Sequence, residues 1–342
     1  MVSVLHEALD NLALVLADRT QLLPMQWVPP PEIDTRLPLG EVLPEPNRMG
    51  VVWPKRACTI DVVAPTTFLP SPNDRLRLRW WPTSEEQRRG TLVIAPPWKV
   101  TSFTGFLPLV RALNRMGLDV VGYPTPYHFE RTPPGALSGE LFATWDMPRT
   151  GWAIRAAALE LCALVESLQP RGPVVLLGTS LGGFLSAMMS VVAPFYPRRA
   201  FQVSRMVLVV PPASFLDTFA KTAIGERYRR LLSLAGGTVP EYSYLEQLAV
   251  PFSPGMFPSV VAGENILIVA GKHDKMVPVE SSQALAEGLK ARFRIYDVGH
   301  VSGLCFSFRL WMDVLSFLEE MPLAQARAEE HQERAHDGVT VR

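Results

Sequence analysis

The chain contains few cysteines, no excess of either charge and no long uncharged apolar run. Cys58, Cys162 and Cys305 are far apart and form no CxxC pair, so we expect neither a disulfide framework nor a zinc site. The 33 basic residues are balanced by 33 acidic ones, which gives no indication of a nucleic acid or an acidic membrane surface as a partner. Since no stretch approaches the roughly 18 apolar residues of a membrane span, we expect no transmembrane segment.

Apolar residues recur at helical spacing over residues 1–20, but Glu7, Asp10 and Asp18 interrupt them. A secretory signal has a basic start and an uninterrupted apolar stretch, so we expect an amphipathic helix instead. The three scattered cysteines fit a reducing cytoplasm. Residues 24–54 contain eight of the 32 prolines and little periodicity. We therefore predict that residues 1–55 form this helix and an extended arm that lies over the main domain.

Two strand-like runs, 58–69 and 74–81, are separated by the turn-forming sequence Pro-Ser-Pro-Asn and predict a β-hairpin. Alternation places Arg75, Arg77 and Arg79 on one face of its second strand. Such a stripe either holds an anionic substrate or forms the solvated face of an edge pair of strands. We expect the solvated face.

From residue 91 onward, short apolar runs alternate with amphipathic segments, which is typical of a mostly parallel sheet with helices on both faces. The predicted strands span 91–95, 118–123, 174–178, 205–210, 265–271 and 293–298. The predicted helices span about 103–115, 152–168, 181–194, 279–290 and 303–320. We assign residues 56–322 to one α/β domain and expect the charged segment 323–342 to be disordered.

The sequence GTSLGG, residues 178–183, lies where one of these strands becomes a helix. A serine on so sharp a turn is held between glycines, with its hydroxyl above the carboxyl ends of the strands, where open α/β sheets bind ligands. The alternative is a tight glycine turn without chemistry. With its complete G-x-S-x-G pattern between strand and helix, the sequence resembles the α/β-hydrolase superfamily over about residues 90–320. The resemblance implies an α/β-hydrolase fold with an inserted helical lid and Ser180 as the nucleophile.

A serine hydroxyl needs a base to take its proton and a carboxylate behind that base. His300 follows the last predicted strand, where the superfamily places its base; the alternative is a hydrogen-bonded loop histidine. Asp274 follows the preceding strand in the sequence GKHDKMVP and completes the order Ser180, Asp274, His300 expected for this fold. Asp217 is the alternative acid, because some members carry it after the strand at 205–210.

Acyl transfer also needs two N–H donors for the developing oxyanion. The resemblance assigns one to Leu181, after the serine, and the other to the loop after the strand at 91–95. Most relatives have His-Gly in that loop, whereas this chain has Pro96-Pro97-Trp98-Lys99. Proline has no N–H, so we expect the Trp98 amide to be the second donor and Lys99 to add positive charge. If this hole is defective, the protein binds without catalysing.

Two long segments are expected to shape the substrate site, together with Thr179 beside the serine. In the loop 123–149, His128, Glu130 and Arg131 either line the pocket or form a local ion pair that pins the loop. The segment 211–260 interrupts the strand-helix alternation where hydrolases insert a lid. Its aromatic residues form either an apolar acyl pocket or the core of the lid.

The stretch GHVSGLCFSFRLWMDVLSFLEEM, residues 299–321, resembles the abhydrolase-domain-18 family, whose members have a similar Gly-His-aliphatic-Ser run before a last aromatic helix. This narrower resemblance favours a lipid-like ester as substrate. We expect a serine hydrolase that cleaves a carboxylic ester or thioester through an acyl-serine intermediate, without a metal or organic cofactor. The alternatives are a peptidase of the same fold and a non-catalytic α/β-hydrolase-like binding protein.

Overall fold

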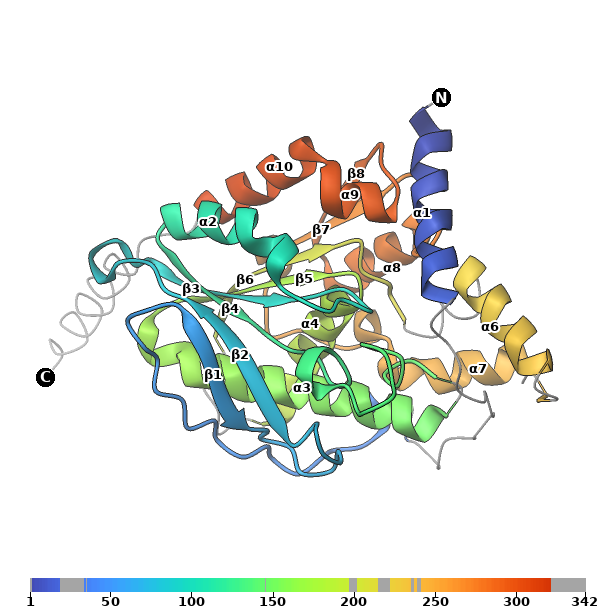
Figure 1. The fold of residues 1–342 in the computed structure, drawn as a ribbon, viewed down its shortest axis with the longest axis horizontal. Helices are drawn as coiled ribbons and strands as arrows, with labels where there is room; N and C mark the ends of the chain where they lie inside the picture. The colour runs from blue at the N-terminus through green and yellow to red at the C-terminus, as the bar shows by residue number, and fades with distance from the viewer. Residues whose placement is uncertain are drawn as a thin grey trace, which may run out of the picture.

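The computed structural model describes residues 2–18, 34, 36–144, 146–196, 202–214, 222–234, 237–238 and 241–320. At its centre is an eight-stranded sheet with the order β1-β2-β4-β3-β5-β6-β7-β8 (Figure 1). The strands are β1 (Cys58–Val63), β2 (Arg75–Trp81), β3 (Gly90–Ala95), β4 (Leu118–Gly122), β5 (Val174–Thr179), β6 (Val203–Val209), β7 (Ile266–Gly271) and β8 (Arg292–Tyr296). Strand β2 is antiparallel to β1 and β4, and all other pairs are parallel, which confirms the mostly parallel sheet.

The predicted hairpin, β1 and β2, forms the antiparallel edge of the sheet. Leu78 and Trp80 of β2 point inward and are fully buried, whereas Arg75 and Arg77 are exposed on the other face. Arg77 lies 3.1 Å from Asp61 on β1, and this ion pair is itself half-exposed. The arginine stripe is therefore the solvated face of the edge pair.

Successive residues of the parallel strands point to opposite faces of the sheet, and both faces are buried. Leu92 and Ile94 of β3 pack on one side with α2 (Leu107–Arg115) and α10 (Phe308–Glu319). Val93 and Ala95 pack on the other side with α3 (Met147–Leu168), α4 (Leu181–Val192) and α8 (Val279–Leu289). Figure 1 shows the helices on either side of the sheet. Strands covered on both faces need apolar residues throughout, which explains the uninterrupted apolar runs.

The last helix differs from the single helix predicted at 303–320. The structure has two helices, α9 (His300–Phe306) and α10, which are bent by 64°. Ser307 between them is not helical, and its hydroxyl accepts a hydrogen bond from the Leu310 amide as the N-cap of α10, which ends the first helix. Within the described ranges no single helix is long and apolar enough to cross a membrane; this bent pair passes that test by length and composition alone.

The segment between β6 and β7 contains α6 (Ala223–Leu234) and α7 (Tyr242–Ala249). Leu245 and Phe252 are buried in the core on the α3 side of the sheet, whereas Tyr242 and Met256 are exposed. Phe252 therefore belongs to the core of the domain. The lid stays a prediction, and residues 215–221 lie outside the described part of the chain.

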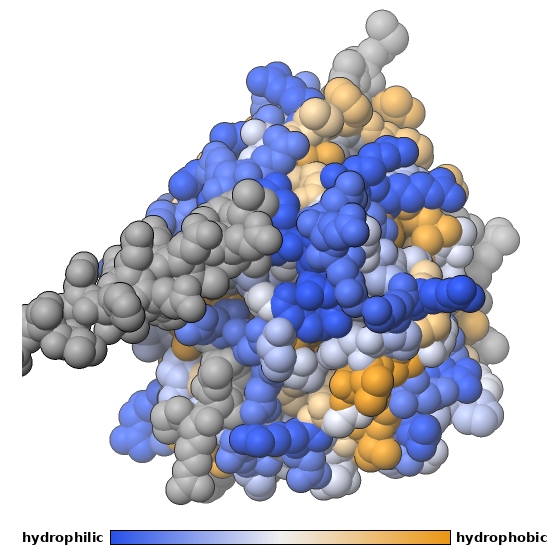
Figure 2. All heavy atoms as spheres, turned by 90° about the vertical axis from the view of Figure 1, so that its left-hand side faces the viewer, coloured by the Kyte–Doolittle hydropathy of each residue, from blue (hydrophilic) through white to orange (hydrophobic). Residues whose placement is uncertain are grey.

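The N-terminal region contacts the rest of the chain at two places. Leu39, Leu43 and Met49 of the arm are buried in the core on the α3 side. The helix α1 (Val2–Asp18) packs against α9 at the end of the sheet where the parallel strands finish (Figure 1). The opposite end of the molecule, seen in Figure 2, is largely polar with scattered apolar patches. The predicted tail, 323–342, lies outside the described residues.

Candidate active site

Ser180 stands at the sharp turn between β5 and α4, at the carboxyl end of the sheet. Its backbone has φ 51° and ψ −115°, and a positive φ is uncommon for a residue other than glycine. The Ser180 amide donates a hydrogen bond to the Val209 carbonyl at 2.8 Å, which ties the turn to β6. The backbone of Ser180 is thus fixed by the turn, and the residue is partly exposed.

Two glycines make this turn possible, because three backbone segments meet around it. A Cβ on Gly178 would lie 2.4 Å from the Gly182 carbonyl oxygen. A Cβ on Gly182 would lie 2.0 Å from the Ala95 carbonyl oxygen and 2.7 Å from that of Pro96. The end of β3 is therefore in direct contact with the first turn of α4, and the loop that begins at Pro96 starts beside Ser180.

His300 and Asp274 reach Ser180 from the turns that follow β8 and β7. Nε2 of His300 is 3.0 Å from Ser180 Oγ, and Nδ1 of the same ring is 2.7 Å from Oδ2 of Asp274. Oδ1 of Asp274 accepts hydrogen bonds from the Met276 amide at 2.8 Å and the Val277 amide at 2.7 Å. The three residues selected from the sequence are thus brought together in one continuous hydrogen-bonded chain.

The Asp274 carboxylate sets the tautomer of the histidine. Because an ionised carboxylate only accepts hydrogen bonds, Nδ1 of His300 carries its proton toward Asp274, and Nε2 faces the Ser180 hydroxyl with a lone pair. Burial lowers the pKa of His300, but the charge and hydrogen bond of Asp274 and the charge of Asp10 together raise it above its ordinary value. Both partners are buried, so solvent weakly screens this interaction.

Asp10 is a neighbour of His300 that sequence reasoning missed. It comes from α1, is fully buried and accepts a hydrogen bond from the His300 amide at 2.9 Å. The sequence shows only an acidic residue that interrupts the apolar pattern of an N-terminal helix, and this pattern does not indicate a partner 290 residues away. Asp217, the alternative acid, lies outside the described residues.

The residues predicted to bind the oxyanion border the same turn. Leu181 is the first residue of α4, and the first amides of a helix have no acceptor within it. After β3, Lys99 adopts φ 63° and its amide donates to Nε2 of His128 at 3.2 Å. The Trp98 side chain donates from Nε1 to the Gly139 carbonyl at 2.8 Å. Both contacts tie the Pro-Pro-Trp-Lys loop to the loop 123–149.

Lys99 and Thr179, both predicted to contact substrate, lie in different surroundings. Burial lowers the pKa of Lys99 to about 8, against the opposing charge of Glu140. Its ammonium lies 4.5 Å from the centre of the Trp98 ring, a cation–π contact. Thr179 is buried, and its hydroxyl is 3.5 Å from the Ala95 carbonyl oxygen on β3. The Thr179 hydroxyl therefore lies against the end of β3.

His128 is fully buried beneath the Lys99 loop. Its Nδ1 lies 2.8 Å from the Pro126 carbonyl oxygen and donates to it, which leaves Nε2 to accept from the Lys99 amide. Burial lowers the pKa of His128 to about 4, so the ring is neutral at physiological pH. Both ring nitrogens are used within the protein, and the ring holds two loops together.

Arg131 forms a buried ion pair with Glu160 of α3. Its Nη1 and Nη2 each lie 2.7 Å from a carboxylate oxygen, and the Tyr123 hydroxyl donates to the same carboxylate at 2.6 Å. Burial and the charge of Glu160 raise the pKa of Tyr123 well above its ordinary value. The loop is thus pinned by an ion pair, but the acid is Glu160 and not Glu130, which pairs with Arg79.

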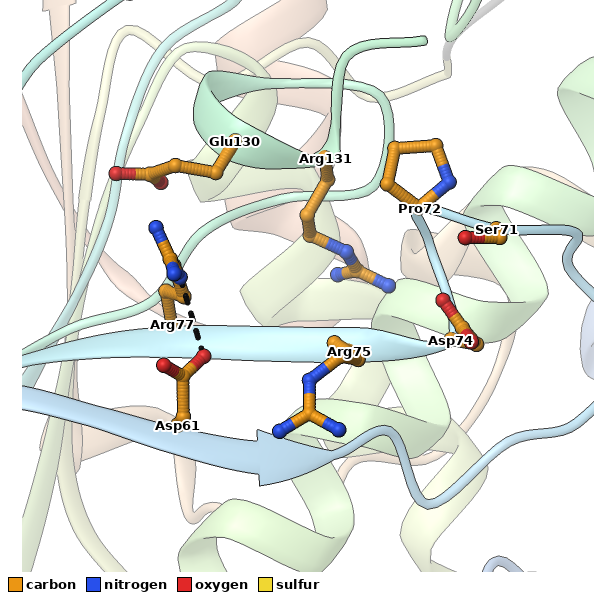
Figure 3. A pocket seen from close by; sticks show the side chains of 8 residues that line it. All are labelled: Asp61, Ser71, Pro72, Asp74, Arg75, Arg77, Glu130 and Arg131. Carbon is orange, nitrogen blue, oxygen red and sulfur yellow. Dashed lines mark hydrogen bonds and ion pairs between the residues drawn. The ribbon is translucent and has the colours of Figure 1, made fainter.

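Figure 3 shows a surface hollow beside Arg131, between the hairpin and the loop. Its lining residues are Asp61, Ser71, Pro72, Asp74, Arg75, Arg77, Glu130 and Arg131. Ser180, Asp274 and His300 are not among them, so the hollow is separate from the Ser180 site. Three acidic and three basic side chains line the hollow, and Arg77 already pairs with Asp61, so its charge does not favour a ligand of either sign.

Solved structures of esterases and of a peptidase are similar to this chain. Acetyl xylan esterase 1 from Thermoanaerobacterium sp. JW/SL YS485 is 18% identical, with a TM-score of 0.53, over 80% of this chain and 86% of that chain. Esterase B from Lactobacillus rhamnosis is 15% identical, with a TM-score of 0.50, over 84% and 92%. Acylaminoacyl peptidase from Pyrococcus horikoshii is 14% identical, with a TM-score of 0.50, over 78% of this chain but 41% of that chain.

No family model and no curated protein sequence matches the chain. At identities this low, similarity to solved structures defines the fold alone. Together with the strand order and the serine turn between β5 and α4, it shows that the chain has the α/β-hydrolase fold predicted from its sequence.

Replacing Glu160 with Gln tests the ion pair that fixes the loop 123–149. The substitution leaves the buried Arg131 guanidinium without a counter-charge, and we expect the free energy of unfolding to fall by roughly 3–5 kcal/mol. The matched control is Glu130→Gln, whose partly exposed pair with Arg79 should contribute less than about 1 kcal/mol. Urea denaturation of the two variants measures the difference. Equal losses would contradict the assignment.

Proposed function

We propose that this protein is a serine hydrolase in which Ser180 attacks the carbonyl carbon of a carboxylic ester or thioester. The observation that carries the proposal is the hydrogen-bonded chain from Ser180 Oγ through His300 to Asp274. Nε2 of His300 takes the hydroxyl proton during the attack and gives it to the leaving alcohol or thiol. Asp274 keeps the ring oriented and stabilises the imidazolium.

The acyl-serine is then hydrolysed by the same groups in the reverse order. His300 takes a proton from water, the resulting hydroxide attacks the acyl carbon, and the proton returns to Ser180 as the acid leaves. The amides of Leu181 and Trp98 are our candidates for stabilising the oxyanion in both steps. Contact between Gly182 and the backbone of Ala95 and Pro96 supports this pairing, because it brings the two donor segments together.

An ester or thioester fits this chain better than a peptide. Two of the similar structures are named as esterases. The match to the acylaminoacyl peptidase covers 41% of that chain, whereas the matches to the two esterases cover 86% and 92% of theirs, so the esterases are the fuller structural counterparts. The resemblance of the run Gly299-His300-Val301-Ser302 to the abhydrolase-domain-18 family supports a lipid-like ester. Within that run, the Ser302 hydroxyl accepts from the Gly299 amide at 2.9 Å and shapes the turn that carries His300.

A fluorophosphonate probe followed by peptide mapping tests the function. We expect the probe to label Ser180, and Ser180→Ala to abolish both labelling and hydrolysis of p-nitrophenyl esters with short and long acyl chains. The matched control, Ser186→Ala on the same helix α4, should keep both. Labelling at another serine would assign the nucleophile to that residue instead of Ser180. A folded wild-type protein that is never labelled would support the binding-protein alternative.

The pH dependence of kcat/KM tests the role of His300 as the base. Protonated His300 cannot accept the serine proton, so the rate should fall as the pH drops through the pKa of this residue. Asp274 and Asp10 raise that pKa, so the acid-side midpoint should lie above the ordinary value of about 6.5. His128 does not interfere, because its pKa is about 4. A midpoint below the ordinary value would contradict a raised pKa for His300.

Replacing Trp98 tests the proposed oxyanion donor. Trp98→Phe removes the indole hydrogen bond to Gly139 but keeps the backbone amide, so most of kcat should remain. Trp98→Pro removes the amide as well, and we expect it to lower kcat by roughly two to three powers of ten relative to Trp98→Phe. Thermal melting must show both variants folded. If Trp98→Pro is as active as Trp98→Phe, the second donor lies elsewhere.

A further inference from the structure

Within residues 4–13 of α1, whose side chains the structure describes, the charged Asp10 faces the turns that carry Asp274 and His300. Asp10 is fully buried, whereas Val4, Leu5 and Leu12 are 67%, 60% and 55% exposed. An amphipathic helix of a globular domain ordinarily turns its apolar side toward the core. Hydrogen bonds to the Asp10 carboxylate therefore help to fix this stretch of the helix against the two turns.

The carboxylate of Asp10 joins the two loops. Oδ2 accepts hydrogen bonds from the His300 amide at 2.9 Å and from the Lys275 amide at 3.2 Å, and Oδ1 accepts from the Val301 amide at 2.9 Å. Lys275 directly follows Asp274 in the chain, and His300 and Val301 are the first residues of α9. One buried side chain thus bridges the turn that carries the acid and the helix that carries the base.

Gly299 makes room for this contact. Its φ of −92° and ψ of −172° are accessible to any residue, so the backbone conformation does not require glycine. A Cβ at this position would lie 2.9 Å from Oδ2 of Asp10 and 3.2 Å from the His6 carbonyl oxygen. Gly299 is therefore needed for the close approach of α1, and a side chain at this position would displace the Asp10 carboxylate.

We propose that Asp10 is a positioning residue of the active site, which holds the backbone of His300 and of the turn after Asp274 in register with Ser180. The inference rests on the proposed function, because the role of Asp10 is to position His300 and Asp274 for that reaction. Among the described residues, the hydrogen-bond donors to Asp10 are backbone amides, and its carboxylate bonds neither Ser180 nor the ring nitrogens of His300. Its loss should therefore lower kcat more than it raises KM, since the base is misplaced while substrate binding is retained.

Charge adds a second effect that a purely structural role would not produce. The carboxylates of Asp274, in the turn after β7, and of Asp10, on α1, both favour protonated His300. Other titratable groups also face each other between α1 and these turns. Oε1 of Glu7 lies 3.5 Å from Nζ of Lys275, and the rings of His6 and His273 stack with centres 5.9 Å apart. His273 also lies 2.6 Å from Asp297. Removing the Asp10 charge should lower the pKa of His300, so the acid limb of kcat/KM should move to lower pH.

The experiment compares Asp10→Asn with Glu7→Gln in the full-length protein. Both substitutions remove one negative charge from α1, but the Glu7 carboxylate is half-exposed and pairs with the Lys275 side chain. We expect Asp10→Asn to lower kcat by roughly ten- to a hundredfold with KM changed much less, and to shift the acid limb to lower pH. Glu7→Gln should leave kcat, KM and the acid limb as in the wild type.

A second variant and an NMR titration test the role of Asp10 even if Asp10→Asn does not fold. Gly299→Ala preserves all charges but displaces Asp10, so it should also lower kcat; it serves in place of Asp10→Asn if that variant does not fold. NMR titration of the His300 imidazole reports its pKa without turnover. If the wild type is labelled at Ser180 but Asp10→Asn and Gly299→Ala keep its kcat, the positioning role is wrong. If the wild type is never labelled, the proposed function fails instead, and the titration alone decides whether Asp10 acts on His300.

Discussion

The close approach of three backbone segments around Ser180 is the constraint on which the site depends. Gly178 touches the backbone of Gly182, and Gly182 touches the end of β3, at distances that leave no room for a side chain. This contact forces β5 to turn directly into α4 and sets the positive φ of Ser180. It also places the loop after β3 beside the N-terminus of α4, where amides without helical acceptors point outward. The serine and the candidate oxyanion donors are therefore products of one packing arrangement.

Burial of charge around the histidine is the second requirement, and the fold meets it with backbone amides. Asp274 and Asp10 are both buried beside one imidazole, and two like charges so close would repel unless each were solvated by the protein. Oδ1 of Asp274 accepts from two amides, and the Asp10 carboxylate accepts from three. These donors belong to turns and to the start of α9, so the backbone segments that position Asp274 and His300 also stabilise the buried charges beside the imidazole.

Much of this architecture could be predicted from the sequence, because strand burial and turn chemistry are local signals. The apolar runs located the parallel strands, and the ends of β7 and β8 located Asp274 and His300. Contacts between distant segments could not be predicted in the same way. The docking of Asp10 depends on how α1 packs, and the partner of Arg131 proved to be Glu160 because the loop folds onto α3. The break at Ser307 was missed because a serine within an apolar helical pattern gives no sign that it caps a second helix.

Backbone strain indicates the same location independently of any resemblance. Lys99 after β3, Ser180 after β5 and Val210 after β6 all adopt positive φ, at 63°, 51° and 47°, although none is glycine. Strain of this kind costs about 1–3 kcal/mol per residue and persists only where the surroundings impose it. For a β-branched residue such as Val210 the conformation is especially unfavourable, and here the Val210 amide is held by the Val269 carbonyl at 2.8 Å. Strands β3, β5 and β6 are neighbours in the sheet, so these three strained residues lie together at the edge where Ser180 meets His300. Because the surroundings hold all three residues in this conformation, the carboxyl end of these strands is where we expect the proposed chemistry to occur.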